Sequence, residues 1–300
     1  PFVKMKDGSG YLVINNQILC ERLFNSLYFD FSPYINGKKK SCGFFDYNKE
    51  FIEKVLFRQT FFNCLPTNCF SFPDRNSREM SEKPNEPDFY ARTKHAELII
   101  VECKAIKMNG ECRDDGDYIR LLDELHEKIV FKTRNLDKNR KAYSLQPKPI
   151  GIGQLIKHID SIEADSFEWD ENIPNDVSYY PILVFEDVRL LQPGFLSILN
   201  RWYYEEIAKM PEMILTDMDC KPIIPVSINT LYLHDNLIRK EGLPNIIDSF
   251  IARNARFDKL TGKYKINELA DFDDYLRKFP FNKSNDIEKW LHKVMKKSNS

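Results

Sequence analysis

The pattern of apolar and polar positions predicts helices and strands that alternate along the first half of the chain. A helix is expected at 46–62, where apolar residues cover most of the circumference, and another after 117, where they form one stripe. Short apolar runs bounded by turn residues predict strands at 69–72, 87–92 and 96–106. This half of the chain is therefore expected to contain a helix, several strands and a second helix.

The second half continues the alternation. An apolar stripe predicts a helix at 151–162, and an apolar run predicts a strand at 177–187. Pro193 stands where a helix start favours proline, and 222–233 is expected to be the last strand. The remainder, 236–300, is expected to be helical. This order of elements favours an α/β fold built around a mixed sheet.

The chain divides into three predicted parts. Residues 1–45 form an N-terminal extension, in which YLVINNQIL alternates around Asn15-Asn16 and predicts a hairpin. Residues 46–235 form the α/β core, and residues 236–300 form a helical C-terminal extension.

The composition is that of an ordinary globular protein. Hydrophobic residues make up 42% and charged residues 30% of the 300 positions, so disorder is not expected. The 44 Lys and Arg residues nearly balance the 45 Asp and Glu residues, which gives no whole-chain indication of a nucleic-acid partner but is compatible with a local basic patch. The acidic stretch DFDD at 271–274 is expected on the surface of a helix.

The sequence favours a cytoplasmic protein. No apolar run approaches the ~18 residues of a membrane helix, so no membrane partner is expected. The start, PFVKMKDGSG, lacks the pattern of a signal peptide, and the absence of an initiator Met fits a processed product or a segment of a longer polypeptide. The seven cysteines form no C-x-x-C pair, which favours reduced thiols.

The stretch AELIIVECKAIK, 96–107, contains the candidate chemistry. Glu102 and Lys104 interrupt a buried apolar strand, and because side chains alternate along a strand they point to the same face. Burying an acid and a base there is costly unless something compensates the charge. A short turn at 93–95 makes the preceding strand an antiparallel neighbour, which brings Asp88 close to Glu102. Two converging carboxylates suit a hard divalent cation such as Mg²⁺ or Mn²⁺, whose bound water is a nucleophile for phosphodiester hydrolysis.

Pro87-Asp88 followed by Glu102-Cys103-Lys104 resembles the signature of the PD-(D/E)XK nuclease superfamily. The resemblance implies a restriction-endonuclease-like fold, with a mixed β-sheet core flanked by helices. It also implies that Asp88, Glu102 and the backbone carbonyl of Cys103 hold Mg²⁺ (or Mn²⁺), while Lys104 orients the attacking water.

A second match lies in GIGQLIKH. It resembles the G-x-x-Q-x-x-x-Y motif of exonuclease-like members, with Gly151 and Gln154 in place and His158 where Tyr is typical. The resemblance implies that Gln154 assists catalysis. Some members add a glutamate from the first core helix to the metal site; Glu50 and Glu53 lie one turn apart on the predicted helix at 46–62, and we favour Glu53 for this role. The resemblance covers about 46–187.

The basic segment from Lys128 to Lys148 is the main candidate for contact with nucleic acid. Basic residues grip phosphates whatever the base sequence. The predicted contacts are Lys132, Arg134, Lys138, Arg140, Lys141, Lys157 and His158. A solvated loop explains the basic segment equally well.

Each candidate also has a plain structural explanation. Glu102 and Lys104 could form an ion pair on a surface strand, although the apolar residues on both faces argue against it. Asp88 could start a turn, Gln154 could lie on a solvated helix face, and Glu53 could favour the dipole of its helix.

The sequence therefore predicts a metal-dependent nuclease acting on DNA rather than RNA. The resemblance implies a restriction, phage-defence or DNA-processing role. The near-neutral charge indicates that partner subunits or further domains supply part of the affinity for nucleic acid. The alternatives are a catalytically inactive nuclease-fold module that binds nucleic acid or a protein partner, and a purely structural α/β domain.

Overall fold

The computed structural model describes residues 2–5, 8, 10–13, 52–53, 55–67, 69–74, 85–106, 116–132, 147–210 and 219–279. They belong to two units, Pro1–Phe51 and Ile52–Ser300. In the first unit, β1 (Phe2–Lys4) pairs antiparallel with β2 (Tyr11–Val13). The predicted strand at 11–13 is therefore present, and its described partner is the preceding strand; the turn predicted at Asn15-Asn16 lies outside the described residues.

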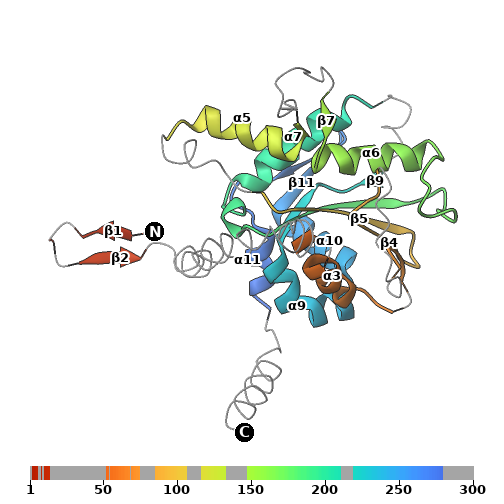
Figure 1. Ribbon diagram of the computed structural model, residues 1–300, viewed down its shortest axis with the longest axis horizontal. Helices are drawn as coiled ribbons and strands as arrows, with labels where there is room; N and C mark the ends of the chain where they lie inside the picture. The colour runs from red at the N-terminus through yellow and green to blue at the C-terminus, as the bar shows by residue number, and fades with distance from the viewer. Residues whose placement is uncertain are drawn as a thin grey trace, which may run out of the picture. The chain divides into compact units, whose positions relative to one another are not determined.

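A mixed sheet forms the centre of the second unit (Figure 1). Its order is β10-β8-β5-β4-β3, with β9 pairing β8. The strands are β3 (Phe70–Phe72), β4 (Phe89–Arg92), β5 (Glu97–Lys104), β8 (Ser178–Phe185), β9 (Asp219–Cys220) and β10 (Ile224–Ser227). β3, β4 and β5 form an antiparallel meander, whereas β5, β8 and β10 run parallel. The predicted α/β fold with a mixed sheet flanked by helices is confirmed.

Helices cover both faces of this sheet (Figure 1). On one side lie α5 (Tyr118–Ile129), α6 (Ile152–Glu163) and α7 (Phe195–Ile207); on the other lie α3 (Arg58–Cys64), α9 (Ile228–Glu241) and α10 (Leu243–Asn254). The coverage explains the continuous apolar run at 98–101, where every residue is fully buried, because a strand enclosed on both faces does not alternate. None of the helices described is long and apolar enough to cross a membrane.

The helix predicted at 46–62 is partly described. Residues 52–53 and 55–57 form π-helical turns that lead into α3, and 46–51 lie outside the described residues. Phe57 and Phe61 pack their rings against Phe89 of β4, at centroid distances of 6.4 and 4.8 Å. The aromatic contacts fix this helical segment against the start of β4.

The prediction of a strand at 222–233 is wrong for 228–233, which belong to α9. β10 ends at Ser227, whose hydroxyl accepts a hydrogen bond from the Thr230 N–H and so begins α9. The sequence INTLYL is apolar enough for either structure, and the capping serine decides in favour of the helix.

The prediction of an all-helical C-terminal part is wrong for 255–266. β11 (Ala255–Asp258) and β12 (Lys263–Ile266) form a hairpin there, in which Gly262 adopts a φ of +65°. The helix expected around 271 is shorter, α11 (Phe272–Arg277), and 280–300 lie outside the described residues.

Asp273 is buried, so the prediction of a surface position for DFDD is wrong at this residue. Its side chain accepts hydrogen bonds from the Ser227 N–H (3.1 Å), the Ser227 hydroxyl (2.6 Å) and the Thr230 hydroxyl (2.7 Å). The carboxylate thereby joins α11 to the start of α9, 46 residues earlier in the chain.

We expect Asp273→Ala to lower the free energy of unfolding by about 2–4 kcal/mol, because it leaves three buried donors without their acceptor. Urea unfolding measures this loss. Asp274→Ala is the matched control, since that side chain is 62% exposed and its ion pair with Arg277 is worth about 0–1 kcal/mol. Equal stability of the two variants would show that the buried carboxylate is dispensable.

Candidate active site

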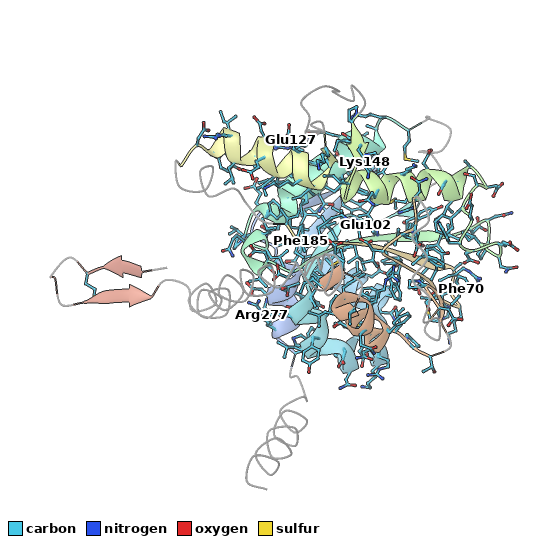
Figure 2. The ribbon with its side chains drawn as sticks, in the orientation of Figure 1. Phe70, Glu102, Glu127, Lys148, Phe185 and Arg277 are labelled. Carbon is cyan, nitrogen blue, oxygen red and sulfur yellow. The ribbon has the colours of Figure 1, made fainter. Side chains whose placement is uncertain are left out.

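The end of β5 brings the predicted acid, base and second acid together. Lys104 Nζ lies 2.9 Å from Glu102 Oε2 and 3.3 Å from Asp88 Oδ2. This contact follows from the strand register, in which Phe89 pairs with Val101, so that Asp88 immediately precedes the paired part of β4. Glu102 is fully buried, at the middle of the fold in Figure 2, whereas the Asp88 side chain is 29% exposed. Solvent therefore reaches the site from the Asp88 side.

The backbone of Cys103 takes part in the same site. β4 pairs with β5 only as far as Val101, and the Cys103 N–H donates to Asp88 Oδ2 at 2.8 Å instead of to a neighbouring strand. Because the N–H and C=O groups of one strand residue point to the same side, the Cys103 carbonyl also faces the Asp88 side. The Cys103 thiol is fully buried, and burial raises its pKa well above the usual value, so it packs rather than reacts.

Glu53 reaches this edge of the sheet from the helical segment before α3. Its Oε1 accepts a hydrogen bond from the Ala105 N–H at 3.4 Å. The structure therefore places Glu53 beside the end of β5.

Helix α6 packs against β5 and β8; it carries Gln154 and His158 of the second motif, and Gly151 is its N-cap. A Cβ at Gly151 would lie 2.5 Å from the Ile129 carbonyl oxygen, and one at Gly153 would lie 2.5 Å from that of Val130. Glycine is therefore required at both positions for the helix to start so close to the end of α5.

His158, rather than Gln154, contacts the acid of β5. His158 Nε2 lies 3.2 Å from Glu102 Oε1, and His158 is only 3% exposed. A contact with nucleic acid, which we expected of His158, would need an exposed ring. Gln154 Oε1 accepts a hydrogen bond from the Gly151 N–H at 2.9 Å and so closes the first turn of α6. Within the described residues, Gln154 makes no hydrogen bond to Asp88, Glu102 or Lys104.

The pKa values of neighbouring groups in the site are shifted in different directions. Burial by itself raises the pKa of Glu102, but the Lys104 ammonium and the contact with His158 outweigh burial and lower this pKa to about 2. Burial and the adjacent Glu102 charge raise the pKa of Asp88 to about 7. Burial disfavours the charged form of Lys104, but the two carboxylates outweigh it and raise the Lys104 pKa. At neutral pH, Glu102 and Lys104 are therefore ionised, whereas the raised pKa of Asp88 places its proton release near neutral pH.

The donor set suits an open oxygen site. Within the described part of the chain, no group of three or more His, Cys, Asp or Glu side chains is arranged to enclose a metal ion. Mg²⁺ does not require such a cage, because it keeps several waters and is bound through one or two carboxylates. Asp88, Glu102 and the Cys103 carbonyl could supply three oxygens, and Glu53 could supply a fourth.

The predicted nucleic-acid contacts are only partly described. Lys132 of β6 (Phe131–Lys132) lies directly opposite Lys148 of β7 (Lys148–Pro149), and both are exposed. Arg134, Lys138, Arg140 and Lys141 lie outside the described residues. Exposed Lys157 donates to Asn85 Oδ1 at 2.5 Å, which places it beside the segment that leads to Asp88.

Three long-range side-chain contacts that the sequence did not indicate fix the segments around the site. Arg92 of β4 donates to both carboxylate oxygens of Asp170, at 2.6 and 3.2 Å, and the Tyr90 hydroxyl donates to Asp170 Oδ2 at 2.9 Å. The segment after α6 is thereby fixed to the strand that follows Asp88. Arg58 of α3 pairs with Glu86 at 3.4 Å and anchors the segment just before Asp88. No spacing rule links residues so far apart in the chain.

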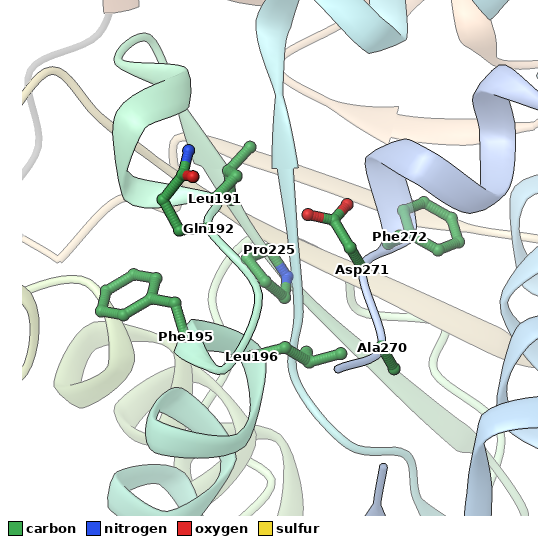
Figure 3. A pocket seen from close by; sticks show the side chains of 8 residues that line it. All are labelled: Leu191, Gln192, Phe195, Leu196, Pro225, Ala270, Asp271 and Phe272. Atoms are coloured by element: carbon green, nitrogen blue, oxygen red, sulfur yellow. The ribbon is translucent and has the colours of Figure 1, made fainter. Parts of the chain in front are cut away.

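A small cavity lies away from these residues, beside β10 (Figure 3). It is lined by Leu191, Gln192, Phe195, Leu196, Pro225, Ala270, Asp271 and Phe272. Its volume of about 10 Å³ is that of a single water molecule, so it offers no room for a substrate. None of the residues that line this cavity belongs to the candidate site at the end of β5.

Comparison of the chain with protein-family models, with curated proteins and with solved structures finds no match.

We expect Asp88→Asn to weaken divalent-cation binding at least about tenfold, because it removes a charged ligand but keeps an oxygen for the Cys103 N–H. Calorimetric titration with Mn²⁺ measures the affinity. Asp160→Asn, at an exposed position of α6, is the control with an equal change of charge and should bind as the wild type does.

The same substitution should not destabilise the metal-free protein at pH 8. The pKa of Asp88 is raised from 3.8 to about 7, so the cost of ionising it in the folded state appears as the pH rises from about 4 to 7 and is complete above 7. Asparagine removes that cost, and we expect the variant to be more stable than the wild type by about 1–3 kcal/mol at pH 8, with a smaller difference at pH 5. Urea unfolding in EDTA at both pH values provides the measurement; an unfolded variant would assign Asp88 a structural role.

Proposed function

We propose that the chain is a Mg²⁺- or Mn²⁺-dependent nuclease of the PD-(D/E)XK type that hydrolyses phosphodiester bonds in DNA. The observation that carries this proposal is the contact of the Lys104 ammonium with both Glu102 and Asp88 at the end of β5. A chance occurrence of P-D and E-x-K in the sequence would not require the three side chains to meet at one point.

The order of the elements supports the proposal. A PD-(D/E)XK core consists of a helix, a three-stranded meander, a helix and a further strand. The chain has α3, the meander β3–β4–β5, the helices α5 and α6, and β8 parallel to β5. A restriction-endonuclease-like fold is therefore part of the proposal.

The residues of the site have distinct roles in it. Asp88, Glu102 and the Cys103 carbonyl, with Glu53 beside them, would hold the cation, which supplies Lewis acidity and a more acidic bound water. Lys104 stays protonated between the two carboxylates, so it can donate hydrogen bonds to a water or to a phosphate oxygen. It positions groups and stabilises negative charge, and it does not act as a free base.

The substrate would approach from the exposed side of Asp88. Lys157 lies next to the segment that leads to Asp88, and Lys132 and Lys148 add charge between α5 and α6. Two lysines directly opposite each other destabilise a strand pair, which favours a role in binding phosphates over a role in folding. The proposed biological setting is restriction, phage defence or DNA processing, with partner subunits or further domains contributing affinity.

Cleavage assays with Lys104→Ala test the proposal. The full chain is incubated with linear, circular and single-stranded DNA and with RNA, in Mg²⁺, Mn²⁺ or EDTA. We expect DNA cleavage that requires the metal and falls about 100-fold or more in the variant, because a donor to the developing charge is lost. Lys94→Ala is the control, since Lys94 is exposed in the turn between β4 and β5. We expect this variant to cleave DNA as the wild type does.

Two outcomes would contradict the proposal. Undiminished cleavage by Lys104→Ala would show that this site does not carry out the reaction. Absence of cleavage with any metal, together with retained binding of nucleic acid, would favour the inactive nuclease-fold module.

A further inference from the structure

A buried histidine from α6 contacts the acid of β5, and the proposed chemistry does not yet use it. His158 Nε2 lies 3.2 Å from Glu102 Oε1, with 3% of His158 and none of Glu102 exposed. An ionised carboxylate only accepts hydrogen bonds, so Nε2 carries the proton and donates it. A charge-assisted hydrogen bond of this kind, made away from water, restricts both groups strongly.

The two oxygens of Glu102 have different partners. Oε2 accepts from Lys104 at 2.9 Å, and the same ammonium also contacts Asp88. Oε1 accepts from His158, which makes no hydrogen bond to Asp88 or Lys104 within the described residues. Of these two acids, His158 therefore hydrogen-bonds only to Glu102, whereas the Lys104 ammonium donates hydrogen bonds to both Glu102 and Asp88. Together they hold the carboxylate with Oε2 turned toward Asp88.

The imidazole is itself held by rigid elements. Its ring meets the Phe167 ring edge-on, at a centroid distance of 6.3 Å and an angle of 80°. The helix that carries it is fixed by the close approach of Gly151 and Gly153 to the end of α5. The direction of the Nε2–H bond is therefore set before any ligand binds, as a supporting group of a binding site requires.

We propose that His158 is a positioning residue of the cation site: it holds Glu102 with one oxygen toward Asp88, and the affinity for a divalent cation depends on the hydrogen bond that it donates. The inference rests on the proposed function, because it takes Glu102 as a ligand of the cation. Supporting partners of metal ligands typically contribute about 10–100-fold to metal affinity.

Direct titration of the full chain with Mn²⁺, followed by calorimetry and by electron paramagnetic resonance without any nucleic acid, tests the inference. His158→Leu keeps much of the side-chain volume and removes the donor, and we expect a loss of about 10–100-fold in Mn²⁺ affinity. His158→Gln places an amide N–H near the position of Nε2, and we expect it to restore most of the affinity. A purely structural role would not distinguish these variants by their donor.

His126→Leu is the matched control. His126 of α5 also packs edge-on against an aromatic ring, that of Trp202, at 5.1 Å and 90°. We expect its Mn²⁺ affinity to equal that of the wild type. Thermal unfolding checks that each variant is folded, and if His158→Leu is not, His158→Asn replaces it, because its shorter amide does not reach Glu102.

The outcomes separate this inference from the nuclease proposal. Wild-type affinity in His158→Leu (or His158→Asn), or a loss in His158→Gln as large as in His158→Leu, would overturn the inference alone. If the wild type binds Mn²⁺ but cleaves no nucleic acid, the nuclease proposal fails and the His158 inference is decided by the titrations. If the wild type binds no divalent cation, both are overturned.

Discussion

The buried charge of Glu102 is the constraint on which the arrangement of the core depends. A carboxylate without solvent exposure, on a central strand covered by helices on both faces, is costly unless opposite charge and hydrogen bonds reach it. Lys104 supplies the charge from the same face of β5, and His158 supplies a hydrogen bond from α6. The position of α6 is therefore fixed by electrostatics as well as by apolar packing.

The candidate site lies where the antiparallel and parallel halves of the sheet differ in length. β5 pairs with β8 as far as Lys104, but its pairing with β4 ends at Val101. The last N–H groups on the β4 side therefore need other acceptors, and Asp88 and Glu53 provide them to Cys103 and Ala105. Because β4 ends early, carboxylates take the place of its backbone as acceptors, and this draws Asp88 and Glu53 to the end of β5.

Local patterns in the sequence predicted much of this site, but long-range packing determined the rest. The alternation of β5 placed Glu102 and Lys104 on one face, and the short turn between the strands brought Asp88 to them. Gln154 and His158 lie one turn apart on α6, so periodicity could not decide which of them reaches Glu102. In the structure Gln154 accepts from the Gly151 N–H in the first turn of its own helix, and His158, one turn further along, contacts Glu102.

Lys104 also determines what kind of cation site this can be. Its ammonium already neutralises Glu102 and contacts Asp88, so these three side chains are charge-balanced without any metal as long as Asp88 keeps its proton. A divalent cation has to share these carboxylates with a permanent positive charge, which weakens its binding. An ion held in this way would be exchangeable and would suit a catalytic role, whereas a structural metal is bound by a closed set of ligands on which folding depends. The fold would therefore not depend on the proposed metal, and the partly exposed Asp88, whose pKa is raised to about 7, would be the group at which an ion enters.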